Sequence, residues 1–288
     1  MKFLGTSAAD SIPNLHCQCA HCMEARKRKG KDIRMRASFL LDENNLIDIG
    51  QDINAQSQKF ELELYRLKNI FITHSHEDHF SLNELLNISH AHKNGGAKGR
   101  EKLNVYLSKP AYGYMEKLYA AMRTSPFNES TESQYVNFIP LDYFENYEAG
   151  DMKIYTLKGN HDAYGEGEKS INYIFTLKNG VKVLYASDTG YYPDETFEHL
   201  EGKMDYVIME CCTTDSKNKG KRAGSHLDIK GYLEMLDEFK KRNFIDENTK
   251  IYATHMSHSH DLMHQELQDT FDKTDYKVVV AYDGLDVC

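Results

Sequence analysis

The sequence predicts one mixed α/β domain built in layers, and three observations lead to this expectation. Short apolar or alternating runs, which are typical of strands, come first in pairs and then alternate with helical stretches. The helical stretches repeat apolar residues every three or four positions, as in Ile229, Tyr232, Leu233 and Leu236. No segment of about 20–50 residues repeats and no Pro-rich linker divides the chain, so we expect a single domain over residues 1–288.

The expected elements follow from these patterns in chain order. Between two of the expected strands stand Asn179 and Gly180, the pair that a tight hairpin turn prefers. The expected strands are short apolar or alternating runs, and they cover residues 38–42, 46–49, 69–73, 103–107, 153–157, 171–177, 182–186, 206–209, 250–253 and 277–281. The expected helices cover residues 82–92, 112–122, 229–241 and 262–271.

Composition narrows the classes of protein to which the chain can belong. The net charge of −9 disfavours broad affinity for long nucleic acids or anionic membranes. No run of 18 apolar residues occurs, which excludes a transmembrane helix, and residues 1–6 lack the apolar stretch of a signal peptide. We therefore expect a cytoplasmic protein without membrane contacts, whose six cysteines are thiols or metal ligands rather than disulfides.

Four potential metal ligands, His74, His76, Asp78 and His79, follow directly after the expected strand 69–73. Imidazole and carboxylate groups suit Zn²⁺, Mn²⁺ or Fe, and a loop at a strand end can fold several of them around one point. In an extended chain His74 and His76 lie on one side, while Asp78 and His79 lie past the bend and can face a second ion. The alternative is a polar surface loop that happens to contain three histidines.

The spacing of these four residues resembles the HxHxDH motif of the metallo-β-lactamase fold. The resemblance implies three further ligands, a His, an Asp and a His in that order, each following a strand. The chain has His161, Asp188 and His255 at such positions. The resemblance also implies an αβ/βα sandwich of two mixed β-sheets with outer helices and the metals at one edge of the sheets.

The resemblance further implies a dinuclear site that holds two divalent metals, Zn²⁺ or Mn²⁺ or Fe. Two such ions about 3.5–4 Å apart share a carboxylate and a hydroxide and lower the proton affinity of that hydroxide. Asp78 is expected to orient this attacking hydroxide as well. In the family, one metal would be held by His74, His76 and His161, the second by Asp78, His79 and His255, and both by the bridging Asp188.

Three cysteines near the N-terminus, Cys17, Cys19 and Cys22, have CxCxxC spacing. Thiolates at this spacing wrap one tetrahedral Zn²⁺, which then needs a fourth ligand, although reactive or packed thiols are an alternative. The chain resembles the phosphonate-pathway phosphodiesterases, and that resemblance implies His258, three residues after His255, as the fourth ligand of a structural zinc. The nearby His16 and His21 remain alternatives, and we expect His260 and His264 to be ordinary surface or helix residues.

The segment Gly224, Ser225, His226 and Leu227 precedes the expected helix 229–241. In the phosphodiesterase branch of the family, a His in this context protonates the leaving alkoxide, and an imidazolium near that oxygen lowers the barrier. The alternative is a His that caps or packs at the helix start. Glu210, at the end of strand 206–209, is expected to accept a hydrogen bond from a ligating histidine.

Seven of the eleven residues 26–36 are basic. Such a run is usually a solvated face, and the alternative is that one or two of these side chains donate to a substrate phosphate.

The resemblance implies a metal-dependent phosphodiesterase, similar to the enzyme that opens phosphoribosyl cyclic phosphate. A hydroxide bridging two metals would attack phosphorus in a small phosphodiester, including a cyclic one, and His226 would protonate the leaving oxygen. The alternatives are a ribonuclease of the tRNA 3′-processing type, which usually adds an RNA-binding arm that we do not find, a thioesterase or lactonase on the same dinuclear site, and a zinc-stabilised binding protein without activity. The oligomeric state is open, and a homodimer is the commonest assembly.

Overall fold

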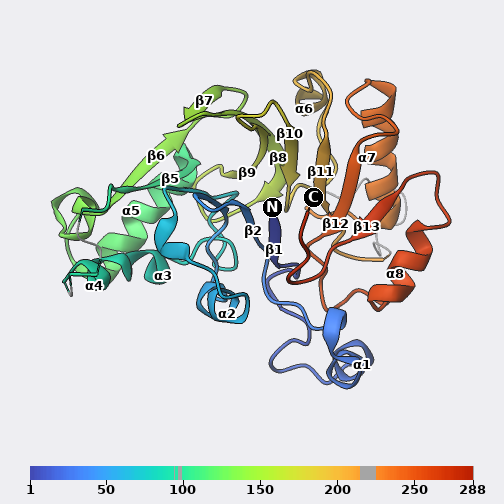
Figure 1. Ribbon diagram of the computed structural model, residues 1–288, viewed down its shortest axis with the longest axis horizontal. Coiled ribbons are helices and arrows are strands. Elements are labelled where there is room, and N and C mark those ends of the chain that lie inside the picture. Colours follow the sequence, from blue (N-terminus) through green and yellow to red (C-terminus); the bar gives the residue numbers. More distant parts are fainter. Residues whose placement is uncertain (94, 97–98, 215–224, 288) are drawn as a thin grey trace.

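The computed structural model describes residues 1–93, 95–96, 99–214 and 225–287, and it contains two β-sheets (Figure 1). The first sheet has the order β1 (Lys2–Gly5), β2 (Ser38–Asp42), β3 (Asn45–Ile47), β4 (Asn69–Phe71), β5 (Leu103–Ser108) and β6 (Val136–Leu141). The second sheet has the order β13 (Val278–Val280), β12 (Lys250–Thr254), β11 (Tyr206–Glu210), β10 (Lys182–Ala186), β9 (Lys169–Thr176), β8 (Met152–Asp162) and β7 (Asn146–Ala149).

Helices cover the outer faces of both sheets. Those beside the first sheet are α2 (Ile53–Lys59), α3 (Leu82–Leu86), α4 (Ile88–Lys93) and α5 (Lys109–Arg123). Those beside the second sheet are α6 (Asp194–Glu198), α7 (Ile229–Lys241) and α8 (His264–Phe271), while α1 (Ala20–Arg28) projects from the body of the molecule (Figure 1). The predicted sandwich of two mixed sheets with outer helices is therefore confirmed. None of the helices in the described residues is long and apolar enough to span a membrane.

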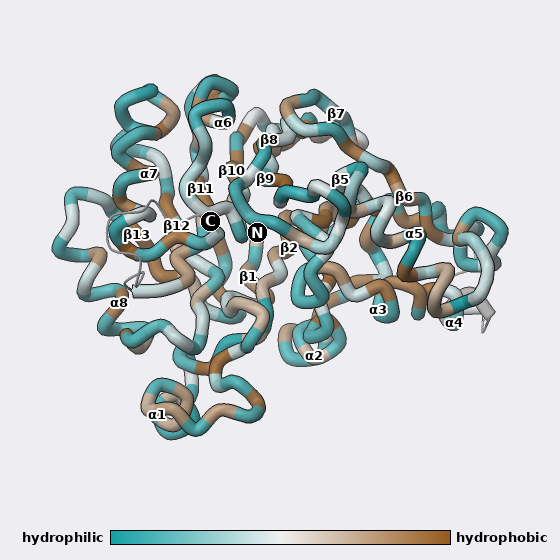
Figure 2. The backbone as a smooth tube through the Cα atoms, turned by 180° about the vertical axis from the view of Figure 1, so that it is seen from behind, coloured by the Kyte–Doolittle hydropathy of each residue, from teal (hydrophilic) through white to brown (hydrophobic). Residues whose placement is uncertain are grey.

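The core has three layers, because side chains of each strand alternate between the two faces of their sheet. Val183 and Tyr185 of β10 point into the layer between the sheets, whereas Leu184 and Ala186 point outward against the helices. Both faces are buried, which explains why these strands are continuous apolar runs in the sequence. Figure 2 shows these hydrophobic stretches in the interior of both halves and mostly hydrophilic outer loops.

The elements with the strongest sequence patterns agree best with the prediction. Helix α7 has the predicted bounds, because its buried side chains recur at helical spacing and the Asp228 side chain caps it by accepting from the Gly231 N–H at 2.7 Å. The hairpin at Asn179 and Gly180 joins the antiparallel strands β9 and β10, and Gly180 has a φ of 85°.

Other elements differ from the prediction or were missed. The expected helix 82–92 is two short helices, α3 and α4, which are separated at Asn87. Helix α1 was missed because only Cys22 and Ala25 are buried in it, which leaves no apolar stripe to detect. Strands β1, β6 and β7 and helices α2 and α6 were missed as well, since they are short and carry polar residues or, in β6, a proline.

We expected His260 and His264 to be ordinary surface or helix residues, and neither side chain lies on the surface. His264 begins α8, but both side chains are buried, with exposed fractions of 1% and 9%. They pack around the buried Arg34, whose guanidinium lies 3.0 Å from His264 Nδ1 and donates to the Thr6 hydroxyl at 2.8 Å. Burial lowers the pKa of His260 to about 3 and that of His264 to about 4, so both rings are neutral beside the arginine.

Candidate metal centre

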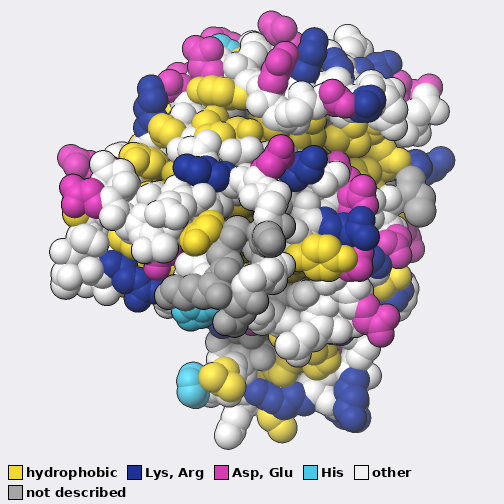
Figure 3. All heavy atoms as spheres, turned by 60° about the vertical axis from the view of Figure 1, so that its left-hand side comes forward, with side chains coloured by type: hydrophobic (Ala, Val, Ile, Leu, Met, Phe, Trp, Pro, Cys, Tyr) yellow, Lys and Arg dark blue, Asp and Glu magenta, His cyan; other side chains and the backbone are white. Residues whose placement is uncertain are grey.

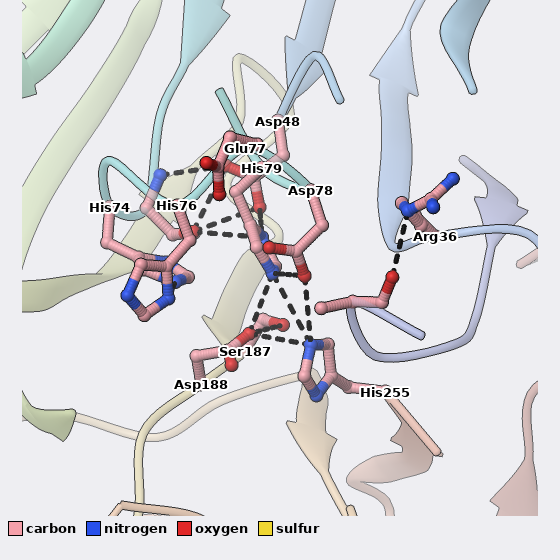
Figure 4. A network of polar contacts seen from close by, with 12 residues as sticks. Arg36, Asp48, His74, His76, Glu77, Asp78, His79, Ser187, Asp188 and His255 are labelled. Carbon is pink, nitrogen blue, oxygen red and sulfur yellow. Dashed lines mark hydrogen bonds and ion pairs between the residues drawn. The ribbon is translucent and has the colours of Figure 1, made fainter. Parts of the chain in front are cut away.

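The predicted dinuclear ligands converge at one edge of the two sheets. Strands β8, β10 and β12 run in the same direction, so their carboxyl ends meet at this edge. His161 lies near the end of β8, while Asp188 and His255 follow β10 and β12. The loop after β4 brings the HxHxDH residues to the same place, and Figure 4 shows Asp78, His79, Asp188 and His255 pointing toward one another.

The first group consists of His74, His76 and His161, whose nitrogens face one another. The His76 Nδ1 atom lies 3.0 Å from His74 Nε2 and 3.2 Å from His161 Nε2. Two nitrogens bound to one tetrahedral zinc stand about 3.3 Å apart, because each Zn–N bond is about 2.0–2.1 Å. His161 Nδ1 lies 3.0 Å from the Ser225 carbonyl and donates to it, which leaves Nε2 unprotonated for a metal. The three histidines therefore fit one metal ion.

The second group consists of Asp78, His79 and His255. The Nε2 atoms of His79 and His255 are 3.3 Å apart, and Asp78 Oδ2 lies 3.1 Å and 4.0 Å from them. All three side chains are buried, and isolated buried charges of this kind are costly unless they are paired or bind a metal. This donor set of two imidazoles and one carboxylate fits a second divalent ion.

Asp188 stands between the two groups. Its Oδ2 atom lies 2.9 Å from Nε2 of both His79 and His255, while its Oδ1 atom lies 3.9 Å from His161 Nε2. Asp188 and His255 have φ values of 49° and 60°, a left-handed conformation that is uncommon for residues other than glycine. The carboxylate thus presents one oxygen to each group, as a bridging ligand does. The ligand roles of these residues stay predictions.

Two buried carboxylates that the sequence did not reveal hold in place the loop after β4 that carries His74, His76, Asp78 and His79, here called the ligand loop. Asp48, which is fully buried, accepts from the Thr73 N–H at 2.8 Å and lies 2.7 Å from His79 Nδ1, so it turns the Nε2 atom of that ring toward the second group. Glu168 accepts from the Ser75 N–H at 2.8 Å and so holds the chain between His74 and His76. The sequence carries no signal for either residue, because burial of a single carboxylate leaves no pattern.

His226 lies beside the ligand groups on the loop before α7. Its Nδ1 atom is 2.8 Å from Glu210 Oε2 and 3.6 Å from Asp188 Oδ1. Burial lowers the pKa of His226, but the Glu210 carboxylate outweighs this and raises it to about 9. Because Asp228 caps α7, the alternative role of His226 as a helix cap does not hold. Gly224 of the same motif lies outside the described residues.

Glu210 differs from its expected role, since it binds His226 rather than a ligating histidine. It is fully buried at the end of β11, and its second oxygen accepts from the N–H groups of Thr189 and Gly190 at 2.6 Å and 2.8 Å. These bonds fix the carboxylate, so it holds His226 in place through Nδ1 and leaves Nε2 to give up a proton.

A pocket of about 430 Å³, here called the metal pocket, opens over both ligand groups. Its lining includes His76, Asp78, Asp188, His226 and His255. Together with the neighbouring Ala8–Asp10 and Ser257 segments, these residues make an open polar site that is large enough for a small substrate.

None of the basic residues 26–36 lines this pocket, so the structure gives no support to their alternative role as donors to a substrate phosphate. Arg26 donates to the carbonyls of Asn14, Cys17 and Cys22. Arg34 is buried, and Arg36 pairs with Asp52 at 2.9 Å. Their guanidinium groups therefore bind groups of the protein itself, within the N-terminal loops and, for Arg34, near the C-terminus. On the face in Figure 3, Lys and Arg side chains are interspersed with Asp and Glu.

The N-terminal cysteines form a second candidate site with His258. The ligand atoms of Cys17, Cys19, Cys22 and His258 all lie within 4.8 Å of one another. Cys22 Sγ lies 3.7 Å from His258 Nδ1, close to the roughly 3.6 Å that separates sulfur and nitrogen ligands on one tetrahedral zinc. A hydrogen bond from the Cys22 N–H lowers the pKa of Cys19 to about 6, which favours the thiolate that zinc requires.

The other face of His258 connects the cysteine site to the metal pocket. His258 Nε2 lies 3.5 Å from the Asp10 carboxylate, and Asp10 lines the pocket. His21 is not a member of the cysteine group, and neither is His16. The structure therefore brings His258, and neither of the two alternatives, together with the three cysteines, and its role as the fourth zinc ligand stays a prediction.

Replacing Cys19 with serine tests this site. We expect the variant to lose one zinc per chain and to lower the free energy of unfolding by about 2 kcal/mol or more, because zinc binding free energy contributes to folding. Metal analysis and thermal unfolding measure both effects. Cys211→Ser is the control, since that thiol is fully buried in the core and should cost packing without costing zinc. A Cys19→Ser protein with its full zinc content would contradict the assignment.

The fold and this arrangement of side chains define a protein of the metallo-β-lactamase fold. The family model described as Anti-Pycsar protein Apyc1 matches residues 36–263, so the chain belongs to the Apyc1 family. No curated protein matches the sequence.

Several solved structures are similar to the chain. A diphosphatase of the PhnP family superposes with a TM-score of 0.72 at 20% identity, covering 99% of this chain and 95% of that one. Zn²⁺-bound PqqB from Methylobacterium extorquens superposes with a TM-score of 0.70 at 15% identity, covering 99% of both chains. The short form of human tRNase Z superposes with a TM-score of 0.59 at 16% identity, covering 100% of this chain and 98% of that one. These similarities show the fold.

Proposed function

We propose that this protein is a metal-dependent phosphodiesterase that hydrolyses a small phosphodiester, including a cyclic one, at a dinuclear site. The observation that carries the proposal is the pair of His226 and Glu210 beside the two ligand groups. A displacement at phosphorus that expels an alkoxide needs a proton donor, and a histidine held by a buried carboxylate is suited to that task. The names of two similar structures, a diphosphatase and a tRNase, agree with chemistry at phosphorus.

The side chains divide the work of this reaction. When bound by the two ligand groups, divalent metals would supply positive charge that stabilises the oxygens on phosphorus and lowers the pKa of the attacking water. Asp78 orients the attacking oxygen, since its carboxylate lines the pocket and faces His79 and His255. His226 donates the Nε2 proton to the leaving oxygen, and Glu210 stabilises the imidazolium that gives it. We propose Zn²⁺ or Mn²⁺, or Fe, for the dinuclear site and Zn²⁺ for the cysteine site.

The same pair argues against a thioesterase. A thioester expels a thiolate whose conjugate acid has a pKa of about 8.5, so it needs no proton donor at neutral pH. A proton donor such as His226, with its raised pKa, therefore fits a reaction that expels an alkoxide better than one that expels a thiolate. The net charge of −9 also opposes a long RNA substrate. The cytoplasmic location and the homodimer stay predictions from the sequence.

Parallel assays of different ester classes test the proposed function. Metal-loaded protein would be given bis(p-nitrophenyl) phosphate, p-nitrophenyl phosphate and a chromogenic thioester under the same conditions. We expect the phosphodiester to have the highest kcat/KM and chelation to abolish its hydrolysis. Preference for the thioester, with no turnover of any phosphodiester, would contradict the proposal while leaving the fold assignment intact.

A further inference from the structure

An exposed aromatic side chain stands at the rim of the metal pocket. Tyr164 lies in the loop between β8 and β9, and 47% of its surface is exposed. It lines the same pocket as His76 and His161, two of the predicted ligands. Single exposed aromatic residues are common on protein surfaces, so the exposure alone assigns no role to Tyr164.

Contacts from three directions fix the Tyr164 ring. Its hydroxyl donates to Glu77 Oε2 at 2.7 Å, and Glu77 belongs to the ligand loop (Figure 4). Its ring centroid lies 4.6 Å from that of His76 and 5.3 Å from that of Tyr114 on α5. A ring that is held at its tip and along two sides loses little further freedom when a ligand packs on it.

The backbone of the same loop is equally constrained. The Tyr164 N–H donates to Ser75 Oγ at 3.0 Å, between two predicted ligands. At the next position a Cβ atom would lie 2.5 Å from the Pro110 carbonyl, so Gly165 permits the close approach of this loop to α5. The Gly165 N–H donates to Glu168 Oε2 at 2.7 Å, and Glu168 also accepts from the Ser75 N–H. One buried carboxylate therefore fixes both the aromatic ring and the ligand loop.

We propose that Tyr164 forms a binding subsite for a planar aromatic group that the phosphodiester carries. The ring is a preorganised stacking surface at a fixed position beside the predicted metal ligands, and stacking on an aromatic side chain is selective for flat groups. Glu77 keeps Tyr164 in place and is itself exposed, so it also accepts a hydrogen bond from a hydroxyl or amino group on the ligand. This inference rests on the proposed function, because it names part of its substrate.

Two substrates that share a leaving group test the subsite. Methyl p-nitrophenyl phosphate and phenyl p-nitrophenyl phosphate differ only in the group that remains on phosphorus. We expect wild-type protein to prefer the phenyl ester, mainly through a lower KM. Tyr164→Leu should reduce the phenyl-over-methyl ratio of kcat/KM about tenfold, within the range for loss of one stacking contact. Tyr164→Phe should keep most of the wild-type ratio, because it retains an aromatic ring.

Another exposed tyrosine provides a matched control. Tyr65 is 64% exposed and its hydroxyl donates to Glu63 at 2.7 Å, but it does not line the metal pocket. Tyr65→Leu should leave the phenyl-over-methyl ratio at the wild-type value. Metal content and unfolding temperature of all variants show whether any of them has lost its structure. An unchanged ratio in a folded, metal-loaded Tyr164→Leu protein would overturn the subsite.

Calorimetric titration of metal-loaded protein with diphenyl phosphate and dimethyl phosphate separates this inference from the proposed function. The subsite is supported if diphenyl phosphate binds more tightly than dimethyl phosphate and if its affinity falls about tenfold in Tyr164→Leu. If these results are found but no ester is hydrolysed, only the proposed hydrolysis fails. Hydrolysis with the same ratio in wild type and Tyr164→Leu overturns the subsite alone. No binding and no hydrolysis of any phosphodiester overturns both.

Discussion

Replacing Asp188 with alanine should lower phosphodiester turnover by at least about 10³-fold. The carboxylate presents Oδ2 to His79 and His255 and Oδ1 toward His161, so both ligand groups lose an oxygen at once. We expect the variant to lose at least one of the two metals of this site and to retain the zinc of the cysteine site. Turnover of bis(p-nitrophenyl) phosphate and metal content per chain measure the two effects.

Asp162→Ala is the matched control for this substitution. Asp162 follows the predicted ligand His161, but its side chain is 77% exposed and pairs with Lys169 at 2.8 Å, a partly exposed ion pair that is expected to contribute little to stability. The control should keep its metals and its turnover. If Asp188→Ala kept both metals and wild-type turnover, Asp188 would not be a ligand of either metal, and the proposed dinuclear site would be contradicted.

Replacing His226 with alanine should lower kcat at least about tenfold on substrates with alkyl leaving groups. Such alkoxides need a proton as they depart, whereas p-nitrophenolate departs without one. The variant should therefore lose much less activity on p-nitrophenyl esters, and its metal content should match that of the wild type. Equal losses on both kinds of substrate would show that His226 acts on the site as a whole rather than as the proton donor.

The pH dependence of the same reaction gives a second test of His226. A donor with a pKa raised to about 9 carries its proton at neutral pH and loses it as the pH rises further, so activity on alkyl esters should fall on the alkaline side. Glu210→Gln removes the charge that raises this pKa and should move the fall to lower pH. His226→Ala should lack it. An alkaline limb that is the same in all three proteins would exclude His226 as its origin.

The fold could be predicted where the sequence pattern reflects packing. Helix α7 and strands β10 and β11 are regular, and their buried faces leave clear periodicities. The predicted ligands could be located because the chain resembles the metallo-β-lactamase fold. The structure brings them together because parallel strands carry such positions to one edge of a sheet. Helix α1 could not be predicted, since it is held by its cysteines and by Arg26 rather than by an apolar face.

The supporting residues of the site lay beyond sequence reasoning for a different reason. Asp48 and Glu168 act through burial and through hydrogen bonds to segments far away in the chain, which no local pattern records. The position of Glu210 at a strand end did indicate a supporting role, but not that its partner is His226. The role of the basic segment could not be decided from the sequence for the same reason. Its arginines face carbonyls and carboxylates of the protein itself, and charge alone does not distinguish that arrangement from a phosphate site.

The central claim is that one chain carries a dinuclear site and a separate zinc site, and the metal content of purified wild-type protein tests it most directly. Protein expressed with supplementary zinc or manganese, freed of loosely bound metal and measured by mass spectrometry should contain about three ions per chain. Removal of one ion by Cys19→Ser and of a different one by Asp188→Ala would place them in the two sites. A wild-type protein with one ion or none after such expression would contradict the account.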